Sequence, residues 1–365
     1  MSSFLTDIYH SWQERHKQNA VRKTYLQLYK KIFALHPELN TPEAHENAWM
    51  NKWKTYDSSV SKASYRIFSK FIGEDINIIP LETCANLVEP KLNPKEYIEF
   101  YADKNSLHLF LPHSFMPNVV LRNISGYFYN NEYHIINDDI DSVLANLQPA
   151  KLILKPSREC SGKGVQLITK TNGKYITSNG EVVSAAYLAS HYGKDYLLQE
   201  CVTQSAYMAQ LNPTSVNTIR LFTYRDIQGT IVPMRSILRI GGKGANVDNA
   251  HSGGLFCGVD DQGHLGKFCC SWLGDRVDTF NDNDFANGDY TIPNYSKIKM
   301  FGTEIAKRIP HHDLVAMDIA LDESNNPTLL EINVGGFSAW LFQFTIGSTF
   351  GKYTDEIMQR CTQKC

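Results

Sequence analysis

The stretch Leu314–Gly336, LVAMDIALDESNNPTLLEINVGG, contains two apolar runs separated by the polar segment ESNN. The first run ends at Asp322 and Pro327 precedes the second, so the connection has the four-residue length of a common hairpin loop. If Asp322 lies opposite Pro327, continued pairing places Asp318 directly across from Glu331. The stretch therefore predicts an antiparallel hairpin that brings two carboxylates together on one face.

The alternation of side chains in this hairpin predicts a metal site. In the second strand it directs Leu330 and Ile332 to the core, and Glu331 and Asn333 to the opposite face. Like charges directly across a strand pair destabilise it, so Asp318 and Glu331 imply a compensating cation. Together with Asn333 they offer the oxygen ligands that suit Mg²⁺. A solvent-facing hairpin with hydrated acids is the alternative, but the glycine segment NVGGF follows at once, and we favour the metal.

A second stretch, LILKPSRECSGKGV (Leu152–Val165), predicts a site for an anion. A buried type of strand delivers Lys155 at its end, and a loop with Gly162 and Gly164 follows. Glycines let successive backbone N–H groups approach an anion closely, so the loop suits a triphosphate. Its spacing differs from the Walker A loop and from the G-x-G-x-x-G loop of dinucleotide folds, and it leads into a strand rather than a helix. A plain hairpin turn stays open as the alternative.

Two arginines occur within predicted strands: Arg220 in NTIRLFTY and Arg239 in SILRIGG. An arginine on a core-lining strand needs an anionic partner, and its planar fork suits phosphate or carboxylate. Salt bridges within the fold would meet the same need. The polar, glycine-bearing loop Gly241–Gly254 follows Arg239 and is of the kind that closes over substrates, which makes His251 a candidate substrate contact.

The composition excludes several classes of protein. The 365 residues carry 36 Lys and Arg against 38 Asp and Glu, so the chain lacks the overall charge typical of nucleic-acid or membrane-surface binding. The opening MSSFLTDIYHSWQERHK lacks the features of a signal peptide, and no stretch reaches the apolar length of a membrane span. We therefore expect a cytoplasmic protein that binds no nucleic acid and does not insert into a membrane.

The pattern along the chain predicts an α+β protein. Apolar and aromatic residues recur at helical spacing over residues 4–35. After residue 150, short apolar runs are separated by glycine, with helices predicted near 184–192, 295–308 and 352–361. Such a pattern is typical of antiparallel sheets packed with helices.

The segments VNTIR, LRIGGKGANVDNAHSGGL and MDIALDESNNPTLLEINVGG resemble the ATP-grasp superfamily, and most of all its sugar-transfer-associated branch. The resemblance covers roughly residues 95–350. It implies the ATP-grasp fold, in which two α+β subdomains clamp ATP between them. We accordingly expect a mainly helical region over residues 1–90, a first subdomain with the glycine loop and adenine hinge over 91–205, and a second with the arginines and the metal hairpin over 206–365.

The resemblance also implies roles for individual residues. The phosphates of ATP would be held by Lys104, Lys155, Ser161, Gly162, Lys163 and Gly164, and the adenine by Gln199, Glu200 and Val202. Catalysis would rest on Arg239, Arg220 and Lys155. The substrate would contact His251, Ser252, Gly253 and Gly254, and Mg²⁺ would bind Asp318, Glu331 and Asn333.

In the reaction that this family implies, a carboxylate attacks the γ-phosphate of ATP, and an amine then displaces phosphate from the acyl phosphate. We therefore expect a carboxylate–amine ligase that uses ATP and Mg²⁺ on a small acidic substrate, a sugar acid or an amino acid, and on an amine acceptor. The name of the branch points to polysaccharide biosynthesis, whose enzymes are then expected partners. The alternatives are a kinase or phosphotransferase on the same fold and a non-catalytic nucleotide-binding regulator of glycosyl transfer.

Overall fold

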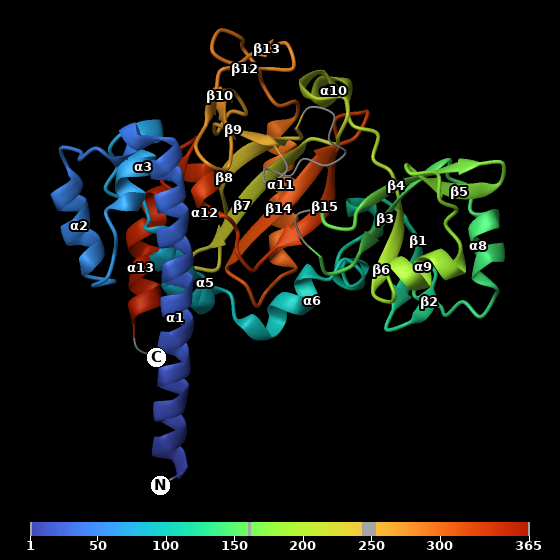
Figure 1. Cartoon of the computed structure of the whole chain (residues 1–365), viewed down its shortest axis with the longest axis horizontal. Helices are drawn as coiled ribbons and strands as arrows, with labels where there is room; N and C mark the ends of the chain where they lie inside the picture. The colour runs from blue at the N-terminus through green and yellow to red at the C-terminus, as the bar shows by residue number, and fades with distance from the viewer. Residues whose placement is uncertain (1, 160–161, 243–252, 364–365) are drawn as a thin grey trace.

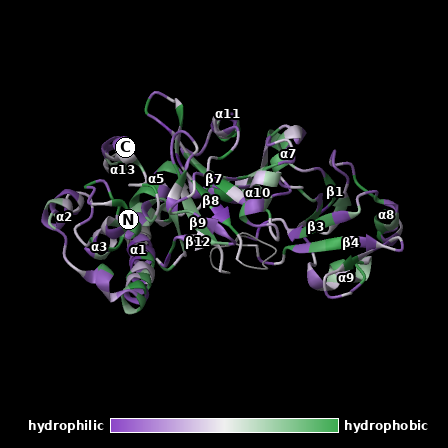
Figure 2. Ribbon diagram, turned by 90° about the horizontal axis from the view of Figure 1, so that it is seen from above, coloured by the Kyte–Doolittle hydropathy of each residue, from purple (hydrophilic) through white to green (hydrophobic). Residues whose placement is uncertain are grey.

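The computed structural model describes residues 2–159, 162–242 and 253–363, with side chains from residue 12 onward. Along the chain, a group of helices is followed by a six-stranded sheet and then by a seven-stranded sheet. Figure 1 shows the seven-stranded sheet in the middle, between the N-terminal helices and the six-stranded sheet. The view from above in Figure 2 shows the same elongated arrangement.

The N-terminal helices begin with α1 (Ser2–Leu35), whose first half extends away from the rest of the molecule (Figure 1). The segments that follow are α2 (Glu46–Lys54), α3 (Ala63–Ile72), α4 (Leu81–Thr83), a π-helical turn (Cys84–Val88), α5 (Glu89–Leu92), α6 (Ile98–Ala102), α7 (Leu107–Phe110) and 3₁₀ turns at Pro37–Asn40, Lys95–Tyr97 and His113–Phe115. Within the described residues, no helix combines the length and the apolar character that crossing a bilayer requires.

Two tryptophans hold these helices together. Trp49 and Trp53 lie one turn apart on α2 and are fully buried. Their indole N–H groups donate to the carbonyl oxygens of Ile78 and Ile76, at 2.8 and 3.1 Å, so burial leaves no indole donor unpaired. These aromatic side chains therefore serve the core of the helical region.

The six-stranded sheet has the order β2-β1-β6-β3-β4-β5, with antiparallel pairing throughout. Its strands are β1 (Val119–Ile124), β2 (Tyr127–Tyr129), β3 (Lys151–Pro156), β4 (Gln166–Thr171), β5 (Lys174–Thr177) and β6 (Tyr196–Glu200). The helices α8 (Ile140–Asn146) and α9 (Ala185–His191) pack on it through one shared apolar cluster.

The seven-stranded sheet has the order β11-β10-β9-β8-β7-β14-β15 and is also antiparallel. Its strands are β7 (Thr218–Arg225), β8 (Ile231–Ile240), β9 (Leu255–Val259), β10 (Leu265–Cys270), β11 (Arg276–Val277), β14 (Leu314–Leu321) and β15 (Pro327–Asn333). The same part of the chain contains α10 (Ala206–Leu211), α11 (Tyr295–Lys307), α12 (Ala339–Gln343), α13 (Thr354–Thr362), the short pair β12 (Thr279–Phe280) and β13 (Asn283–Asp284), and a 3₁₀ turn (Gly351–Tyr353).

Alternation along β7 gives this sheet two different faces. Ile219 and Leu221 belong to the apolar cluster that includes α11, whereas Phe222 and Tyr224 belong to the cluster built with the N-terminal helices. Arg220 lies two residues before Phe222 and so shares its face. The N-terminal helices thus cover the part of this face that contains Phe222 and Tyr224. The charged side chain of Arg220 lies next to the covered part.

The hairpin of β14 and β15 places Asp318 opposite Glu331, as the sequence predicts. The register near the loop was predicted wrongly, however. Leu321, rather than Asp322, lies opposite Pro327. The predicted pairing was therefore wrong by one residue next to the loop, but the predicted pairing of Asp318 with Glu331 was correct.

A β-bulge accounts for the difference. Next to the Asp318–Glu331 pair, Ile319 lies opposite Leu329, so Leu330 has no partner on β14. Leu329 consequently takes the buried position, and the prediction that Leu330 points into the core was wrong. An extra residue in one strand shifts the alternation by one, which a count of sequence positions does not reveal.

The order of elements agrees with an α+β protein that opens with helices. Helical turns continue to Phe115, beyond residue 90, and the two sheets take their strands from residues 119–200 and 218–333. The helices predicted within the later part of the chain are α9, α11 and α13. The division into three regions at residues 90 and 205 stays a prediction.

Candidate active site

Three adjacent strands bring three charged side chains together. Asp318 on β14 lies opposite Arg220 on β7, and Arg239 lies on the next strand, β8. Arg220 donates from Nε to Asp318 Oδ1 and from Nη2 to Oδ2, both at 2.8 Å, and Arg239 donates from Nη1 to Oδ2 at 2.7 Å. Both arginines thus form the internal salt bridges that the sequence left open.

Asp318 is ionised in this cluster. Burial by itself would raise the pKa of this carboxyl, which is only 3% exposed, but the charges and hydrogen bonds of Arg220 and Arg239 hold the pKa well below its ordinary value. Two guanidinium groups share one carboxylate. Within the described residues, these three side chains therefore form one charged network that fixes the position of both guanidinium groups.

The second carboxylate of the hairpin, Glu331, pairs with a lysine from a distant part of the chain. Lys104 Nζ lies 2.9 Å from Glu331 Oε1 and also donates to the carbonyl oxygen of Glu159 at 2.9 Å. The backbone N–H of Lys104 donates to the carbonyl oxygen of Ser157. Ser157 and Glu159 belong to the loop after β3, so Lys104 links that loop to β15.

The repulsion predicted between the two carboxylates is therefore met by cations of the protein itself. Arg220 and Arg239 neutralise Asp318, and Lys104 neutralises Glu331. A bound metal ion is therefore not required to offset the repulsion between Asp318 and Glu331. The donor chemistry must instead decide whether Mg²⁺ suits the site.

Lys155 is the penultimate residue of β3 and lies close to Lys104 and Glu331. It is 8% exposed, and no described residue lies within hydrogen-bonding distance of its ammonium group. The pKa of Lys155 is lowered from 10.5 to about 7, because burial and, to a smaller extent, the charge of Lys104 lower it while Glu331 partly offsets both. A buried ammonium group without an anionic partner is suited to receive an anionic ligand.

The loop after β3 has the conformation that its glycines predict. Gly162 and Gly164 have φ values of 71° and 72°. A side chain at Gly164 would also meet Pro156, since an added Cβ would lie 2.8 Å from Pro156 Cγ. Lys163 lies apart from the other predicted phosphate ligands: its side chain is 78% exposed and pairs only loosely with Glu159, at 3.7 Å.

The predicted adenine hinge lies where the chain leaves the six-stranded sheet. The side chain of Gln199 donates to the carbonyl oxygen of Pro117 at 3.0 Å, and the backbone N–H of Glu200 donates to that of Asn118 at 2.9 Å. Val202 follows in an irregular, half-buried segment. These donors are already engaged, so a ligand here would meet the carbonyl groups and the backbone of the irregular segment.

Part of the predicted substrate site falls outside the described residues. This applies to His251 and Ser252, and to Ser161 of the glycine loop. Gly253 and Gly254 are described and directly precede β9, whose Phe256 pairs with Arg239 on β8. The end of the predicted substrate loop is thus adjacent to the arginine cluster.

Two functional candidates escaped the sequence reasoning. Ser338 Oγ accepts a hydrogen bond from Arg220 Nη1 at 3.4 Å, and Glu89 Oε2 accepts one from the backbone N–H of Gly336 at 3.1 Å. The only signal near Ser338 was the irregular glycine segment after Asn333. Glu89 lies in a region whose sequence contains no motif.

The side chains around the hairpin fit Mg²⁺ in kind. Asp318 and Glu331 are carboxylates, and Asn333 lies close enough for its Nδ2 to donate to Asp318 Oδ2 at 3.4 Å, which leaves its Oδ1 as a further acceptor. Hard oxygen ligands of this sort, completed by water and phosphate oxygens, are those that Mg²⁺ takes. Within the described ranges, no cluster of three or more His, Cys, Asp or Glu side chains forms an all-protein metal site.

Replacing Asp318 with Asn should strongly destabilise the fold. The free energy of unfolding should fall by about 3–5 kcal/mol, because two buried guanidinium groups lose their counter-charge. Urea unfolding measures this loss. Since folding lowers the pKa of Asp318, its contribution is fully present above about 3.9, the ordinary aspartate value, and is lost as the pH falls through the lowered pKa.

The matched control is Glu331→Gln, on the opposite strand of the same hairpin. Its loss should be clearly smaller, because Lys104 keeps the carbonyl oxygen of Glu159 and the side chain of Glu331 is 22% exposed. Equal losses in the two variants would contradict the assignment of Asp318 as the main counter-charge.

Comparison with solved structures finds several similar proteins. D-cycloserine synthetase is similar at 13% identity with a TM-score of 0.43, covering 74% of this chain and 74% of that one. N5-carboxyaminoimidazole ribonucleotide synthetase from Thermotoga maritima is similar at 12% identity and a TM-score of 0.39, covering 73% of this chain and 51% of that one. An L-amino acid ligase from Bacillus licheniformis is similar at 12% identity and a TM-score of 0.40, covering 72% of this chain and 47% of that one. This chain thus spans about half the length of the latter two.

Sequence comparison gives the decisive result. No curated protein sequence matches the chain. The model of one protein family, described as sugar-transfer associated ATP-grasp, matches residues 85–359, well over half of the chain and the part that carries both sheets. The chain therefore belongs to the sugar-transfer-associated ATP-grasp family and has the ATP-grasp fold.

Proposed function

We propose that this protein is an ATP-dependent ligase that activates the carboxylate of a small acidic substrate, a sugar acid or an amino acid, as an acyl phosphate for attack by an amine. One observation carries the proposal. Lys104 and Lys155, beside the glycine loop, meet Arg220, Arg239 and the carboxylate hairpin of the other sheet. Lys155 has no hydrogen-bonding partner among the described residues, and buried cationic groups gathered in this way suit a polyphosphate and the charge that develops during phosphoryl transfer.

Each group of residues in the site would bind a different part of the reactants. Lys104, Lys155 and the glycine loop would hold the phosphates, and the segment from Gln199 to Val202 would bind adenine through its backbone. Arg220 and Arg239 would neutralise the phosphoryl group during its transfer. The substrate would lie against the loop that ends at Gly254, beside the arginines.

Asp318, Glu331 and Asn333 would hold Mg²⁺, which supplies charge neutralisation at the phosphate oxygens. Among the described residues, Asp318 Oδ1 accepts one hydrogen bond, from Arg220 Nε, so it keeps a lone pair for a ligand. Lys104 would exchange part of its contact with Glu331 for a phosphate oxygen. The ion pairs of the hairpin therefore pre-position its ligands in the absence of the nucleotide.

The site as proposed requires no protein nucleophile. Its described members are Lys, Arg, Asp, Glu and Asn side chains, which position reactants and neutralise charge. Positioning of the substrate carboxylate against the γ-phosphate then supplies most of the rate enhancement for the first step. Polysaccharide biosynthesis enters the proposal only through the description of the family.

Replacing Lys155 with Met should weaken ATP binding by roughly 10- to 100-fold, because a charge-assisted phosphate contact is lost. Isothermal titration calorimetry with a non-hydrolysable ATP analogue measures the affinity. Lys151→Met is the matched control, since Lys151 begins the same strand, is exposed and lies at the end away from the loop. Unchanged affinity in Lys155→Met would mean that the glycine loop is only a turn.

The protonation of Lys155 gives a second readout. Lys155 has a pKa of about 7 and should gain a proton when phosphate binds beside it, so at about pH 8 binding should take up nearly one proton. Calorimetry in buffers of different ionisation enthalpy detects this uptake, which Lys155→Met should abolish. Because folding lowers this pKa, the burial of Lys155 destabilises the protein most at and below pH 7, and the penalty disappears as the pH rises towards 10.5. Lys155→Met should therefore raise the melting temperature of the free protein near neutral pH.

The reaction products distinguish a ligase from a kinase. With acids and amines drawn from polysaccharide pathways, a ligase should release ADP and inorganic phosphate in equal amounts, and hydroxylamine should trap the acyl phosphate as a hydroxamate. A kinase releases ADP but leaves phosphorus on its product. ADP accompanied by a stable phosphoester or phosphoramidate in phosphorus NMR would overturn the ligase proposal in favour of a phosphotransferase.

A further inference from the structure

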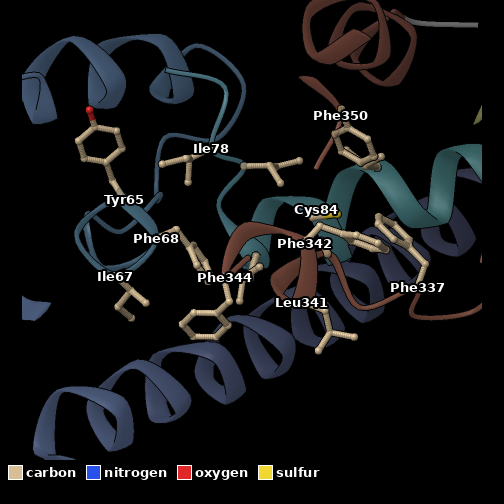
Figure 3. Packing of buried hydrophobic residues seen from close by; sticks show 14 of the residues in the cluster. Tyr65, Ile67, Phe68, Ile78, Cys84, Phe337, Leu341, Phe342, Phe344 and Phe350 are labelled. Carbon is tan, nitrogen blue, oxygen red and sulfur yellow. The ribbon is translucent and has the colours of Figure 1, made fainter. Parts of the chain in front are cut away.

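The N-terminal helices form a wall beside the proposed active site. They pack on the face of the seven-stranded sheet that also carries Arg220 and Asp318, as the burial of Phe222 among them shows. The segment after β15 lies along this boundary. Figure 3 shows Phe337 and Phe342 from that part of the chain beside Cys84 of the N-terminal region.

Two cavities open between this wall and the segment after β15. The smaller, of about 100 Å³, lies between Tyr25 of α1, Glu89, Ser338 and Trp340. The larger, of about 260 Å³, is lined by polar residues of α1 and by Gly335. Glu89 contributes to the lining of both cavities and therefore lies where they adjoin.

The carboxyl group of Glu89 is held in place by one oxygen only. Oε2 accepts the hydrogen bond from Gly336, whereas Oε1 has no hydrogen-bond partner among the described residues. Burial raises the pKa of Glu89 to about 7, against the opposing effect of the bond from Gly336. This carboxyl group can therefore take up and release a proton near neutral pH.

The cavities are adjacent to the proposed chemistry. Ser338 lines the smaller cavity, and its hydroxyl oxygen accepts the hydrogen bond from Arg220 Nη1. Arg220 in turn binds Asp318. One serine side chain thus separates the cavity from the arginine cluster at which the acyl phosphate would form.

We propose that the smaller cavity binds the primary ammonium group of the acceptor, and that Glu89 is the general base that deprotonates it. The proposal rests on the proposed ligase function. A carboxylate is the natural counter-charge of an ammonium ion. Tyr25 and Trp340 also line this cavity, and aromatic residues attract cations.

Glu89 accepts one proton from the ammonium group, which leaves a neutral amine and a neutral carboxyl group. The nitrogen lone pair forms the bond to the acyl carbon, the bond from that carbon to the phosphate oxygen breaks, and inorganic phosphate leaves with the electron pair. The amide nitrogen then loses its remaining extra proton to phosphate or water.

Glu89→Gln tests the proposal, because glutamine keeps the shape and the acceptor oxygen but cannot take the proton. With a pair of substrates that the wild type joins, amide formation should fall by about 10²- to 10⁴-fold. Hydroxamate formation should stay unchanged, since hydroxylamine is already unprotonated near neutral pH and needs no base. Glu14→Gln is the matched control: Glu14 lines the larger cavity but is exposed, and both reactions should survive.

The outcomes separate the two proposals. A wild-type protein that yields neither ADP nor hydroxamate would overturn the ligase function. Hydroxamate formation in Glu89→Gln together with undiminished amide formation would overturn only the role of Glu89.

Binding supplies a readout that does not depend on turnover. Saturation-transfer NMR with methylammonium should show contact with the wild type and with Glu14→Gln, and none with Glu89→Gln. Tetramethylammonium, which has no N–H group to donate, should give no Glu89-dependent signal. Absence of a methylammonium signal from the wild type, or equal signals from all three proteins, would overturn the proposed cavity.

Discussion

Asp318 between Arg220 and Arg239 is the interaction on which the rest of this structure depends. A carboxylate that is 3% exposed is tolerated only because both of its oxygens accept hydrogen bonds from charged donors. The three side chains come from three neighbouring strands. A slip of one residue in any of these strands would turn a charge towards the apolar face that contains Leu221 and Met317, so the triad fixes the register of the sheet.

The fixed register divides one face of the sheet into an apolar end and a charged end. The N-terminal helices cover the apolar end, and the ring of Phe337 stacks on Phe222 at the boundary, with centroids 4.6 Å apart. This stacking anchors the chain three residues beyond Val334. The glycines in between are then held against Glu89, which explains how a region with no sequence motif comes to border the charged site.

Lys104 links the two sheets. Lys104 contacts the loop after β3 through its backbone and side chain, and it contacts β15 through Glu331. Val202 lies in the segment by which the chain passes from one sheet to the other. A ligand that replaces part of the Lys104–Glu331 contact would therefore act at the junction between the sheets.

The sequence by itself determined the α+β class, the family and the facing carboxylates, because alternation and a short loop are local properties. It also placed Lys155 at the end of a strand and the glycines in the loop that follows, since a strand and a glycine loop are local patterns. It did not reveal the bulge at Leu330, since an unpaired residue changes the register without changing the composition of the strand.

Only the tertiary structure decided which groups neutralise the carboxylates and what lies beside them. Lys104 reaches Glu331 across more than two hundred residues, and Glu89 reaches Gly336 across a similar separation. Ion pairs and cavities of this kind depend on how whole layers pack on one another. The sequence pattern within one strand or loop cannot specify these ion pairs and cavities. They are determined by the burial of charge and apolar surface between segments that become neighbours only after folding.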